Sequence, residues 1–347
     1  MWFLLYLPEP MTNTLKRVIK INAKSPKPKY RQIIDSIYNS IENGALKKGD
    51  KVPSINQVCD AFGLSRDTVM LAFGELKSKG VLMSQPGKGY YIATTEIRRD
   101  ERVFVLFDEL NAFKEDLYNS LVNTMKGKAS VEVYFHHFNY KVFKNLIQES
   151  VGHYTSYIIM PATFDNTSTL LAKLPLERVF ILDRMKADLK DYPVVYQDFE
   201  LDFYESLNEG APLLRKYRKL VFVHPGGKEP DERVKGFERF CLEKKFKYEI
   251  IKSLSDIRPG LYEAWFLISD RDLVQLVKIA KNYKLKLGRK FGIVSFNDTM
   301  LKEVVAGGIT TISTDFTEMG KTLGTMLLNH KSGQVRNPSK LIVRKSL

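Results

Sequence analysis

Polar and charged side chains follow the apolar runs of this 347-residue chain, and their types suit a ligand that carries several hydroxyl groups. The runs end in Asp108-Glu109, Pro161-Ala162, Asp183-Arg184, His224-Pro225-Gly226-Gly227, Ser269-Asp270 and Asn297-Asp298. A carboxylate or an amide can accept or bridge two adjacent hydroxyls, so a crevice lined by several of them would bind a polyhydroxylated molecule. Each position alone has an ordinary explanation, because Asp and Asn are common in turns and at helix N-caps. Six such positions at one crevice favour a binding site.

The apolar runs are predicted to be strands that alternate with helices. We expect strands at 102–107, 131–135, 156–160, 178–182, 193–196, 219–223, 248–251, 264–268, 291–295 and 309–312. Helices are expected between them, for example at 113–127, 140–150, 201–216, 231–245, 271–285 and 315–330. This alternation is typical of parallel sheets with helices on both faces, and ligands of such folds bind beyond the carboxyl ends of the strands. The polar residues at the strand ends would therefore lie together.

The first hundred residues have a different pattern, in which three helices precede a glycine-rich hairpin. The first helix is indicated by five residues that share one face, Tyr30, Ile33, Ile34, Ile37 and Ile41. The second opens at a capping box of Ser54 and Gln57, and the third runs from Ser65 to Gly80. Two short strands, 81–84 and 90–93, flank a turn. A helix-turn-helix followed by such a wing lays one helix in the DNA major groove, so we expect this segment to bind DNA.

The positive charge of the chain is concentrated in the same segment. The chain has 54 Lys and Arg against 40 Asp and Glu, a formal net charge of +14. Residues 1–100 hold 16 cations against 9 acids, and the other 247 hold 38 against 31, so each part carries +7. The excess per residue is thus more than twice as high in the first part, as the neutralisation of phosphates requires. In the second part, solvated lysines on helix faces explain the excess better than a second nucleic-acid site does.

The winged segment resembles the N-terminal domain of the GntR family of bacterial regulators. The similarity is carried by Pro28-x-Tyr30-x-Gln32-Ile33, Ile41-x-x-Gly44-x-Leu46-x-x-Gly49-Asp50, Val52-Pro53-Ser54, Ser65-Arg66-x-Thr68-Val69, Leu76-x-x-x-Gly80 and Gly87-x-Gly89. The resemblance implies that Ser65 and Arg66 start the recognition helix and that the glycine-rich wing follows the minor groove. Met70 stands where many members carry an arginine, so base reading is expected to depend more on Arg66 and the wing, or the operator to differ from the commonest one. The residues expected at the DNA are Ser54, Ser65, Arg66, Thr68, Met70, Gly87, Lys88 and Gly89.

From Val103 onward the chain resembles, more diffusely, the periplasmic-binding-protein-like sensor domain of LacI-type sugar repressors. The similarity is carried by Leu174-Pro175, Val179-Phe180-Ile181-Leu182-Asp183-Arg184, Val195-Tyr196-Gln197-Asp198, Arg233-x-x-Gly236-Phe237, Phe291-Gly292-Ile293-Val294-Ser295-Phe296-Asn297-Asp298, Ile309-Thr310-Thr311-Ile312, Asp315-Phe316-x-x-Met319-Gly320 and Leu341-Ile342-Val343-Arg344-Lys345-Ser346. The resemblance implies a two-lobed α/β domain with parallel sheets that holds a sugar between its lobes. The residues expected at the sugar are Asp108, Asp183, Arg184, Arg233, Asp270, Asn297, Asp298 and Phe316.

Two of these positions, Phe316 and Arg233, leave alternatives open, and a third, Asn297, departs from the family pattern. Phe316 would pack on the sugar ring, but a core position beside Met319 and Leu323 is an equal possibility. Asn297 replaces a more usual Asp, which removes one charge, adds a donor and should change the preferred sugar. Arg233 is favoured as a ligand contact because it opens a helix beside the gap.

The predicted domain order is a leader at 1–26, a winged helix-turn-helix at 27–93, a linker at 94–102 and a two-lobed domain at 103–347. Met11 follows the apolar start, so it is an alternative first residue to Met1. The linker has no counterpart of the short hinge helix of LacI proteins. The effector is therefore expected to change the separation or orientation of two winged helices in a homodimer. The candidate dimer surface is the first lobe, including the helix at 113–127 with its stripe of Phe113, Leu117, Leu121 and Met125, although ordinary core packing would explain the stripe equally well.

These features predict a bacterial transcriptional regulator, a repressor of carbohydrate-utilisation genes that a monosaccharide releases from double-stranded operator DNA. A neutral pentose or deoxyhexose is favoured, because five acids would repel a phosphate and two arginines are too few to outweigh them. The acids are Asp108, Glu109, Asp183, Asp270 and Asp298, and the arginines are Arg184 and Arg233. The alternatives are a phosphosugar-responsive regulator and a small-molecule-modifying enzyme built on the same α/β domain.

The remaining sequence signals favour a cytoplasmic protein without cofactor or metal. The two cysteines, Cys59 and Cys241, lie in different predicted domains, which fits a reducing compartment and forms no zinc pattern. The loop at Gly226-Gly227 could hold a phosphate in an enzyme, but it lacks the spacing of a dinucleotide or Walker motif. The apolar start, Met1–Leu7, is far too short to span a bilayer.

Overall fold

The computed structural model describes residues 11–97, 101–255 and 257–347. The chain forms two compact units, one that contains the described residues up to 97 and one that contains residues 101–149 and 154–347. Within the described residues, none of the helices has the length and apolar character needed to cross a membrane.

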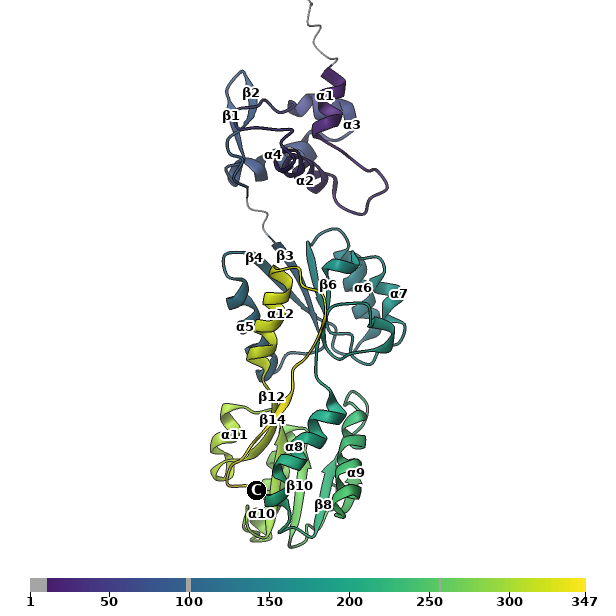
Figure 1. The fold of residues 1–347 in the computed structure, drawn as a ribbon, viewed down its shortest axis with the longest axis vertical. Helices are drawn as coiled ribbons and strands as arrows, with labels where there is room; N and C mark the ends of the chain where they lie inside the picture. Colours follow the sequence, from purple (N-terminus) through teal and green to yellow (C-terminus); the bar gives the residue numbers. More distant parts are fainter. Residues whose placement is uncertain (1–10, 98–100, 256) are drawn as a thin grey trace, which may run out of the picture. The chain divides into compact units, whose positions relative to one another are not determined.

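The first unit is a winged helix-turn-helix with an additional helix at its start. Its elements are α1 (Met11–Val18), α2 (Lys29–Glu42), α3 (Ile55–Phe62), α4 (Arg66–Ser78), β1 (Leu82–Gln85) and β2 (Gly89–Ile92), as labelled in Figure 1. Ser54 and Gln57 form the predicted capping box, and Gly63 ends α3 in the left-handed conformation with φ of 62°. The hydroxyl of Ser65 accepts a hydrogen bond from the amide of Thr68 and so opens α4. β1 and β2 pair antiparallel and form the wing.

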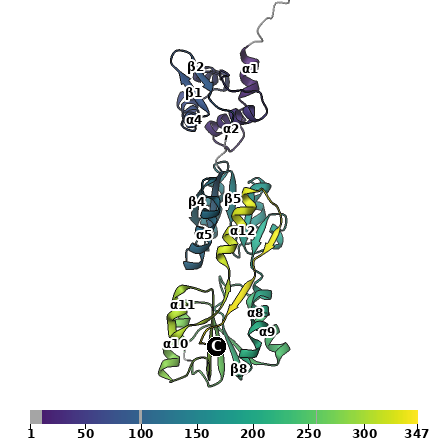
Figure 2. The ribbon, with the colours of Figure 1, turned by 60° about the vertical axis from the view of Figure 1, so that its left-hand side comes forward.

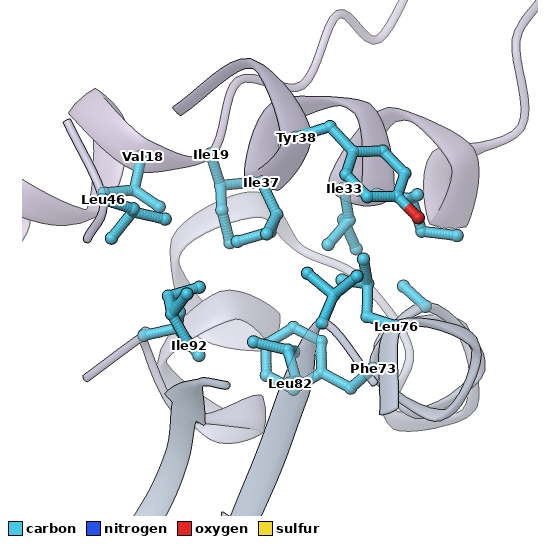
Figure 3. Packing of buried hydrophobic residues seen from close by; sticks show 14 of the residues in the cluster. Val18, Ile19, Ile33, Ile37, Tyr38, Leu46, Phe73, Leu76, Leu82 and Ile92 are labelled. Carbon is cyan, nitrogen blue, oxygen red and sulfur yellow. The ribbon is translucent and has the colours of Figure 1, made fainter. Parts of the chain in front are cut away.

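The core of this unit includes residues that the sequence prediction had assigned to a leader. Val18 and Ile19 are buried with Ile37 of α2 and Leu46, and Figure 3 shows these four side chains together. The hydroxyl of Ser40 also donates to the carbonyl oxygen of Val18 over 3.0 Å. The prediction of a leader over 1–26 is therefore corrected for α1 and the residues after it, while residues 1–10 lie outside the described part. The apolar face of α1 was too short to be distinguished from a disordered segment by periodicity alone.

The second unit has two lobes, each built on a six-stranded sheet. The first sheet has the order β13-β7-β6-β5-β3-β4 and is parallel throughout. Its strands are β3 (Glu101–Phe107), β4 (Ala129–Phe135), β5 (Ser156–Ile159), β6 (Val179–Asp183), β7 (Val194–Tyr196) and β13 (Gln334–Arg336). The second sheet has the order β14-β12-β11-β10-β8-β9, and only β14 is antiparallel to its neighbour. Its strands are β8 (Lys219–Val223), β9 (Lys247–Ile251), β10 (Glu263–Leu267), β11 (Phe291–Phe296), β12 (Thr310–Thr314) and β14 (Ser339–Ile342).

Helices follow most strands, as the alternation of apolar runs predicted. They are α5 (Ala112–Met125), α6 (Tyr140–Ser150), α7 (Thr167–Leu171), α8 (Phe199–Leu214), α9 (Glu232–Lys244), α10 (Asp270–Asn282), α11 (Met300–Val304) and α12 (Phe316–Leu328). The chain passes between the lobes three times, from β7 to α8, from β12 to α12 and from β13 to β14. Both lobes are therefore built from discontinuous parts of the sequence, and the three connecting segments lie at their junction (Figures 1 and 2).

The stripe on α5, which the prediction included in the candidate dimer surface, is part of the core of the first lobe. Leu117, Leu121 and Met125 are fully buried against the sheet and α12. Figures 1 and 2 show α5 and α12 side by side. Their approach is so close that a Cβ atom added at Gly320 would lie 2.3 Å from the carbonyl oxygen of Leu117. The prediction that this stripe pairs two chains is thus wrong, and core packing, its stated alternative, explains it.

Candidate functional site

A cavity of about 290 Å³ opens between the two lobes of the second unit. It lies beyond the carboxyl ends of β3, β6, β10 and β11, where open α/β sheets bind ligands. Its lining contains seven of the eight residues predicted at the ligand, namely Asp108, Asp183, Arg184, Arg233, Asp270, Asn297 and Phe316. The structure thus brings these seven together, and their contact with a ligand stays a prediction.

Asp298, the eighth residue, is not in the cavity lining. It forms a two-point ion pair with Arg344, with Nη1–Oδ1 and Nη2–Oδ2 distances of 2.6 and 2.7 Å. The hydroxyl of Thr311 donates to it as well. Burial alone would raise the pKa of Asp298, but the hydrogen bonds from Arg344 and Thr311 lower it below its usual range. Asp298 therefore joins the end of β11 to the segment after β14, and its prediction as a ligand contact is corrected.

Arg233 in the first turn of α9 is held rigidly in the cavity wall. Its guanidinium group lies between two aromatic rings, 4.9 Å from the centroid of Phe199 and 4.7 Å from that of Phe296. Its Nη1 donates to Oε2 of Glu229 over 3.1 Å. Burial lowers the pKa of Arg233 from its usual value, although Glu229 and Asp183 oppose this effect. Stacking and ion pairing together fix the plane of the guanidinium group, which prepares it for directional hydrogen bonds.

A buried ion pair lies in the first-lobe wall of the cavity. One of its residues, Asp108, was predicted from the sequence, but the other, Lys114, was not. The ammonium group of Lys114 on α5 contacts the carboxylate of Asp108, which follows β3. Burial lowers the pKa of Lys114, and the nearby carboxylate of Asp183 opposes that shift. Lys114 stands three residues before Leu117 and seven before Leu121, so its position on the buried face of α5 was a readable signal. Beside it, Phe113 packs on Phe316 with ring centroids 4.8 Å apart, and both rings line the cavity.

Three further cations in the lining also have carboxylate partners. Lys302 is 2.9 Å from Asp270 and donates to the carbonyl oxygens of Phe296 and Asn297. Two other pairs join the lobes to each other, because Lys228 of the second lobe bonds Glu109 of the first at 2.7 Å and Arg184 of the first bonds Glu232 of the second at 2.9 Å.

The formal charges of the cavity lining are balanced, which corrects the expectation of an acidic crevice. The lining contains five carboxylates, Asp108, Glu109, Asp183, Glu229 and Asp270, and five cations, Lys114, Arg184, Lys228, Arg233 and Lys302. Each of the five cations is paired with a carboxylate. Repulsion of an anion by unpaired acids is therefore not supported, but an anion would have to displace an existing partner of a cation. This displacement costs interaction energy, so the lining still suits a neutral ligand.

A chain of hydrogen bonds leads from the cavity to the three segments that connect the lobes. Nε2 of Gln197, after β7, donates to Oδ1 of Asp183 over 2.6 Å. The hydroxyl of Thr314, at the end of β12, donates to Oε1 of Gln197 over 2.6 Å. The hydroxyl of Ser339, at the start of β14, lies 2.9 Å from that of Thr314. Because Gln197 donates through its amide nitrogen and accepts from Thr314 through its amide oxygen, the proton of the Thr314 hydroxyl is already used, and Ser339 must donate to Thr314.

Asp183 also has an unusual backbone conformation. Its φ is 79°, in the left-handed region that non-glycine residues rarely adopt. Such a conformation costs on the order of 1–3 kcal/mol and persists where the surrounding structure enforces it, often at ligand sites. In this conformation Asp183 lines the cavity and its carboxylate accepts the hydrogen bond from Gln197.

In the first unit, a second depression is lined by four of the eight residues predicted at the DNA, namely Ser54, Arg66, Gly87 and Gly89, but not by Ser65, Thr68, Met70 or Lys88. It lies between the start of α3, the start of α4 and the wing, and is lined by Ser54, Ile55, Asn56, Arg66, Ser84, Gln85, Pro86, Gly87, Gly89 and Tyr90. Nη1 of Arg66 donates to Oδ1 of Asn56 over 2.8 Å. The hydroxyl of Ser65, which caps α4, lies 2.8 Å from that of Thr68, and Lys88 lies exposed in the wing turn. Asn56 was not predicted, although it directly precedes the capping-box residue Gln57 in the sequence.

Two apolar side chains on α4 face solvent. Met70 is 48% exposed and the adjacent Leu71 is 55% exposed, whereas Val69, Ala72 and Phe73 are buried. The sequence prediction had noted Met70 as a departure but had not identified Leu71. Exposed apolar residues on a helix beside an exposed arginine form a surface that can contact the edges of bases.

Comparison with known proteins gives separate matches for the first and the second unit of the chain. Residues 29–92 match the model of bacterial regulatory proteins of the gntR family, and residues 213–347 match a periplasmic binding protein-like domain. The mannosyl-D-glycerate transport/metabolism system repressor MngR of Escherichia coli is 38% identical over 98 residues, which are 28% of this chain and 38% of that protein. The repressor YtrA of Bacillus subtilis is 33% identical over 115 residues, which are 33% of this chain and 85% of that protein. This chain thus spans well under half of MngR but most of YtrA.

Solved structures resemble the second unit in fold. A LacI family transcriptional regulator from Silicibacter pomeroyi superimposes with a TM-score of 0.60 at 18% identity, covering 71% of this chain and 98% of that one. A periplasmic binding protein/LacI transcriptional regulator from Alkaliphilus metalliredigens, complexed with D-xylulofuranose, gives a TM-score of 0.56 at 14% identity, covering 71% and 99%. At these identities the likeness shows the two-lobed fold.

Proposed function

The chain belongs to the gntR family of bacterial regulatory proteins, and we propose that it is a transcriptional repressor of carbohydrate-utilisation genes. In this proposal the winged helix binds one half-site of a palindromic operator, and a homodimer binds both halves. A neutral monosaccharide binds between the lobes of the second unit and weakens operator binding.

The surface of α4 supports direct reading of bases. Arg66 is exposed at the start of the helix and can donate two hydrogen bonds to a guanine. Met70 and Leu71, one turn further on, provide apolar contacts of the kind that recognise a thymine methyl group. The depression between Arg66 and the wing is open to a phosphate backbone, since Ser54, Ser84 and the wing glycines line it. These features support base contacts by α4 and positioning contacts by its neighbours.

The pairing of every cation in the cavity lining is the observation that carries the proposal of a neutral effector. The groups that present hydrogen-bonding atoms are carboxylates, amides and ion-paired cations, which bind hydroxyls without a net charge. Phe113 and Phe316 supply an aromatic wall for the apolar face of a ring. The volume of about 290 Å³ is at the low end of ligand pockets, so a single sugar unit fits better than an oligosaccharide. A pentose or deoxyhexose is favoured, and the sugar named for the Alkaliphilus regulator is of this size.

DNA binding is tested by selecting duplexes from a random pool and measuring affinity by fluorescence anisotropy. We expect an inverted repeat to be enriched. Arg66→Ala should weaken binding to it by about 1–3 kcal/mol and relax the preference at one base position. Lys77→Ala, an exposed cation in the last turn of the same helix, is the matched control and should leave the preference intact. Full sequence preference in the Arg66→Ala protein would contradict the assignment of α4.

Effector binding is tested by thermal-shift screening of monosaccharides and their phosphates, followed by calorimetry. We expect a neutral monosaccharide to bind and to lower operator affinity. Asp183→Asn should weaken its binding at least tenfold, whereas Asp191→Asn, an exposed carboxylate of the same lobe, should not. Tight binding of a phosphosugar alone would overturn the neutral effector and leave a phosphosugar-responsive regulator as the function.

A further inference from the structure

A strongly basic segment precedes and overlaps the start of the region that matches the gntR family. Between residues 11 and 34 the chain has seven Lys and Arg residues and no Asp or Glu. The family match begins at residue 29, so α1 and the loop after it are additions at the N-terminal side of the winged helix.

This segment has a fixed place on the unit. Leu15, Val18 and Ile19 are buried, with 7%, 6% and 0% of their surfaces exposed. Beyond α1, the amide of Lys20 donates to the hydroxyl of Ser36 on α2 over 3.0 Å. The apolar side of the segment packs on α2, and this packing fixes where the charged residues beside it lie.

The seven cations divide into two groups. Three of them hold the unit together, because Lys27 pairs with Asp35 at 2.6 Å, Arg31 pairs with Glu75 at 2.6 Å, and Lys29 donates to backbone carbonyl oxygens of the loop. The other four, Lys16, Arg17, Lys20 and Lys24, are exposed to solvent. Four exposed cations in a segment without any carboxylate create a positive potential, which favours an anionic partner.

Arg17 and Lys20 also face a depression of about 360 Å³ between this segment and α2. The wall opposite them consists of polar side chains of α2, from Gln32 to Asn43, of which Gln32, Ser36 and Ser40 already donate to carbonyl oxygens of the unit. Asp35 is the one carboxylate in the lining, and Lys27 neutralises it. The depression is thus a polar surface with a net positive charge.

We propose that Lys16, Arg17, Lys20 and Lys24 bind backbone phosphates of the duplex beside the half-site that α4 reads. The inference rests on the proposed DNA binding and extends its footprint. Duplex DNA carries a negative charge roughly every 1.7 Å along its axis, so it can neutralise several clustered cations at once. Phosphate contacts carry no sequence information, so this segment adds affinity for any duplex and leaves the choice of sequence to α4.

The test is the salt dependence of DNA binding. The triple variant Lys16→Ala, Arg17→Ala and Lys20→Ala is compared with a triple variant of exposed lysines in the second lobe, Lys278→Ala, Lys281→Ala and Lys286→Ala, which loses the same charge. Anisotropy titrations on operator and on unrelated duplex give the slope of log K against log salt. Each phosphate contact contributes about 0.9 to this slope, so the first variant should lower its magnitude by about 2–3.

We expect the first variant to weaken operator and unrelated duplex by the same factor and the second to match the wild type. An unchanged slope in the first variant, or the same change in both, would refute the role of the segment while leaving DNA recognition by α4 intact. A wild-type protein that binds duplexes without any sequence preference would refute the proposed function instead, and the slopes on unrelated duplex would still test the segment. Circular dichroism confirms that each variant is folded.

Discussion

Gln197 donates a hydrogen bond to Asp183 over 2.6 Å and accepts one from Thr314 over 2.6 Å, so a single amide joins the cavity to two of the segments that connect the lobes. Through Ser339 the same chain reaches the third segment. A ligand hydroxyl that donates to Asp183 competes with Gln197 for the same carboxylate. That carboxylate orders the series of hydrogen bonds through Gln197, Thr314 and Ser339. The coupling of the effector to the relative position of the lobes is therefore expected to depend on Gln197.

The first prediction is that Gln197→Leu uncouples the effector from DNA. Leucine removes both hydrogen bonds of the amide but keeps its approximate size, so the connecting segments lose their link to Asp183. Operator affinity without sugar should stay within about twofold of wild type. The loss of affinity on adding sugar, a coupling of about 1–3 kcal/mol in typical allosteric proteins, should fall toward zero.

Gln275→Leu is the matched control for this experiment, because Gln275 lies on α10, where its amide donates to a carbonyl oxygen within the second lobe. It should preserve the response to sugar. Anisotropy titrations with and without the effector measure both quantities. Equal responses of the Gln197→Leu protein and the wild type would rule out a role of this hydrogen-bond chain.

The second prediction concerns the contact between α5 and α12. A Cβ atom at residue 320 would be 2.3 Å from the carbonyl oxygen of Leu117 and 3.0 Å from the amide nitrogen of Leu121, and backbone cannot yield as a side chain can. Gly320→Ala should therefore lower the free energy of unfolding of the second unit by about 1–3 kcal/mol. Gly74→Ala, at an open position of helix α4, should stabilise the first unit by about 0.5–1 kcal/mol. Differential scanning calorimetry measures both, and stabilisation by Gly320→Ala would show that the helices are not in contact.

The third prediction compares two adjacent carboxylates of the cavity. Asp108 is buried against the ammonium group of Lys114, so Asp108→Asn leaves a buried charge without its partner and should cost about 3–5 kcal/mol of stability. Glu109 pairs with Lys228 where both side chains are partly exposed, so Glu109→Gln should change stability by less than about 1 kcal/mol. Urea unfolding gives both values. Equal effects of the two substitutions would show that the pair of Asp108 and Lys114 is solvated.

The fourth prediction concerns pH. Burial of His136 lowers its pKa to about 4, and only the hydrogen bond to the carbonyl oxygen of Met160 opposes this shift, while Lys114 adds to it. The unfolded chain, in which the pKa is near 6.5, then binds the proton more readily than the folded chain does. The stability that neutral His136 contributes is complete above pH 6.5 and is lost as the pH falls from 6.5 toward 4.

His136→Phe should therefore reduce the fall in stability between pH 6.5 and 4, even if the variant is less stable at pH 7 through loss of the bond to Met160. The exposed His153 provides the control, because His153→Phe should leave the slope unchanged. Unfolding free energies at several pH values give these slopes. Parallel curves for the wild type and His136→Phe would assign the acid sensitivity to other groups.

Much of the fold followed from apolar runs, and the errors have identifiable causes. Each of the ten predicted strands of the two-lobed domain overlaps a strand of the structure, because strands buried on both faces are continuous apolar segments. The short helices α7 and α11 were not among the ranges given as examples, since five residues are too few for a helical period. The stripe on α5 was visible, but a sequence does not show whether a stripe meets α12 or another chain.

The lining of the candidate cavity could also be predicted only in part from the sequence. Residues directly after strands, such as Asp183 and Asn297, could be placed because the carboxyl ends of parallel strands meet. Lys114 and Glu229 enter from helices or loops, so the balance of charge appeared only in three dimensions. Asp298 directly follows the cavity residue Asn297, but its side chain pairs with Arg344, which lies 46 residues later in the sequence.

The three passages of the chain between the lobes have a consequence for biosynthesis. Five of the six strands of the second sheet are contiguous from β8 to β12, whereas the first lobe needs α12, whose residues Phe316, Met319 and Leu323 complete its core. On a ribosome, the strands of the first sheet up to β7 emerge early but must wait for α12, and the second lobe assembles in the interval. A nascent chain halted before residue 316 would therefore expose the apolar face of α5 to chaperones, although most of the protein had already been translated.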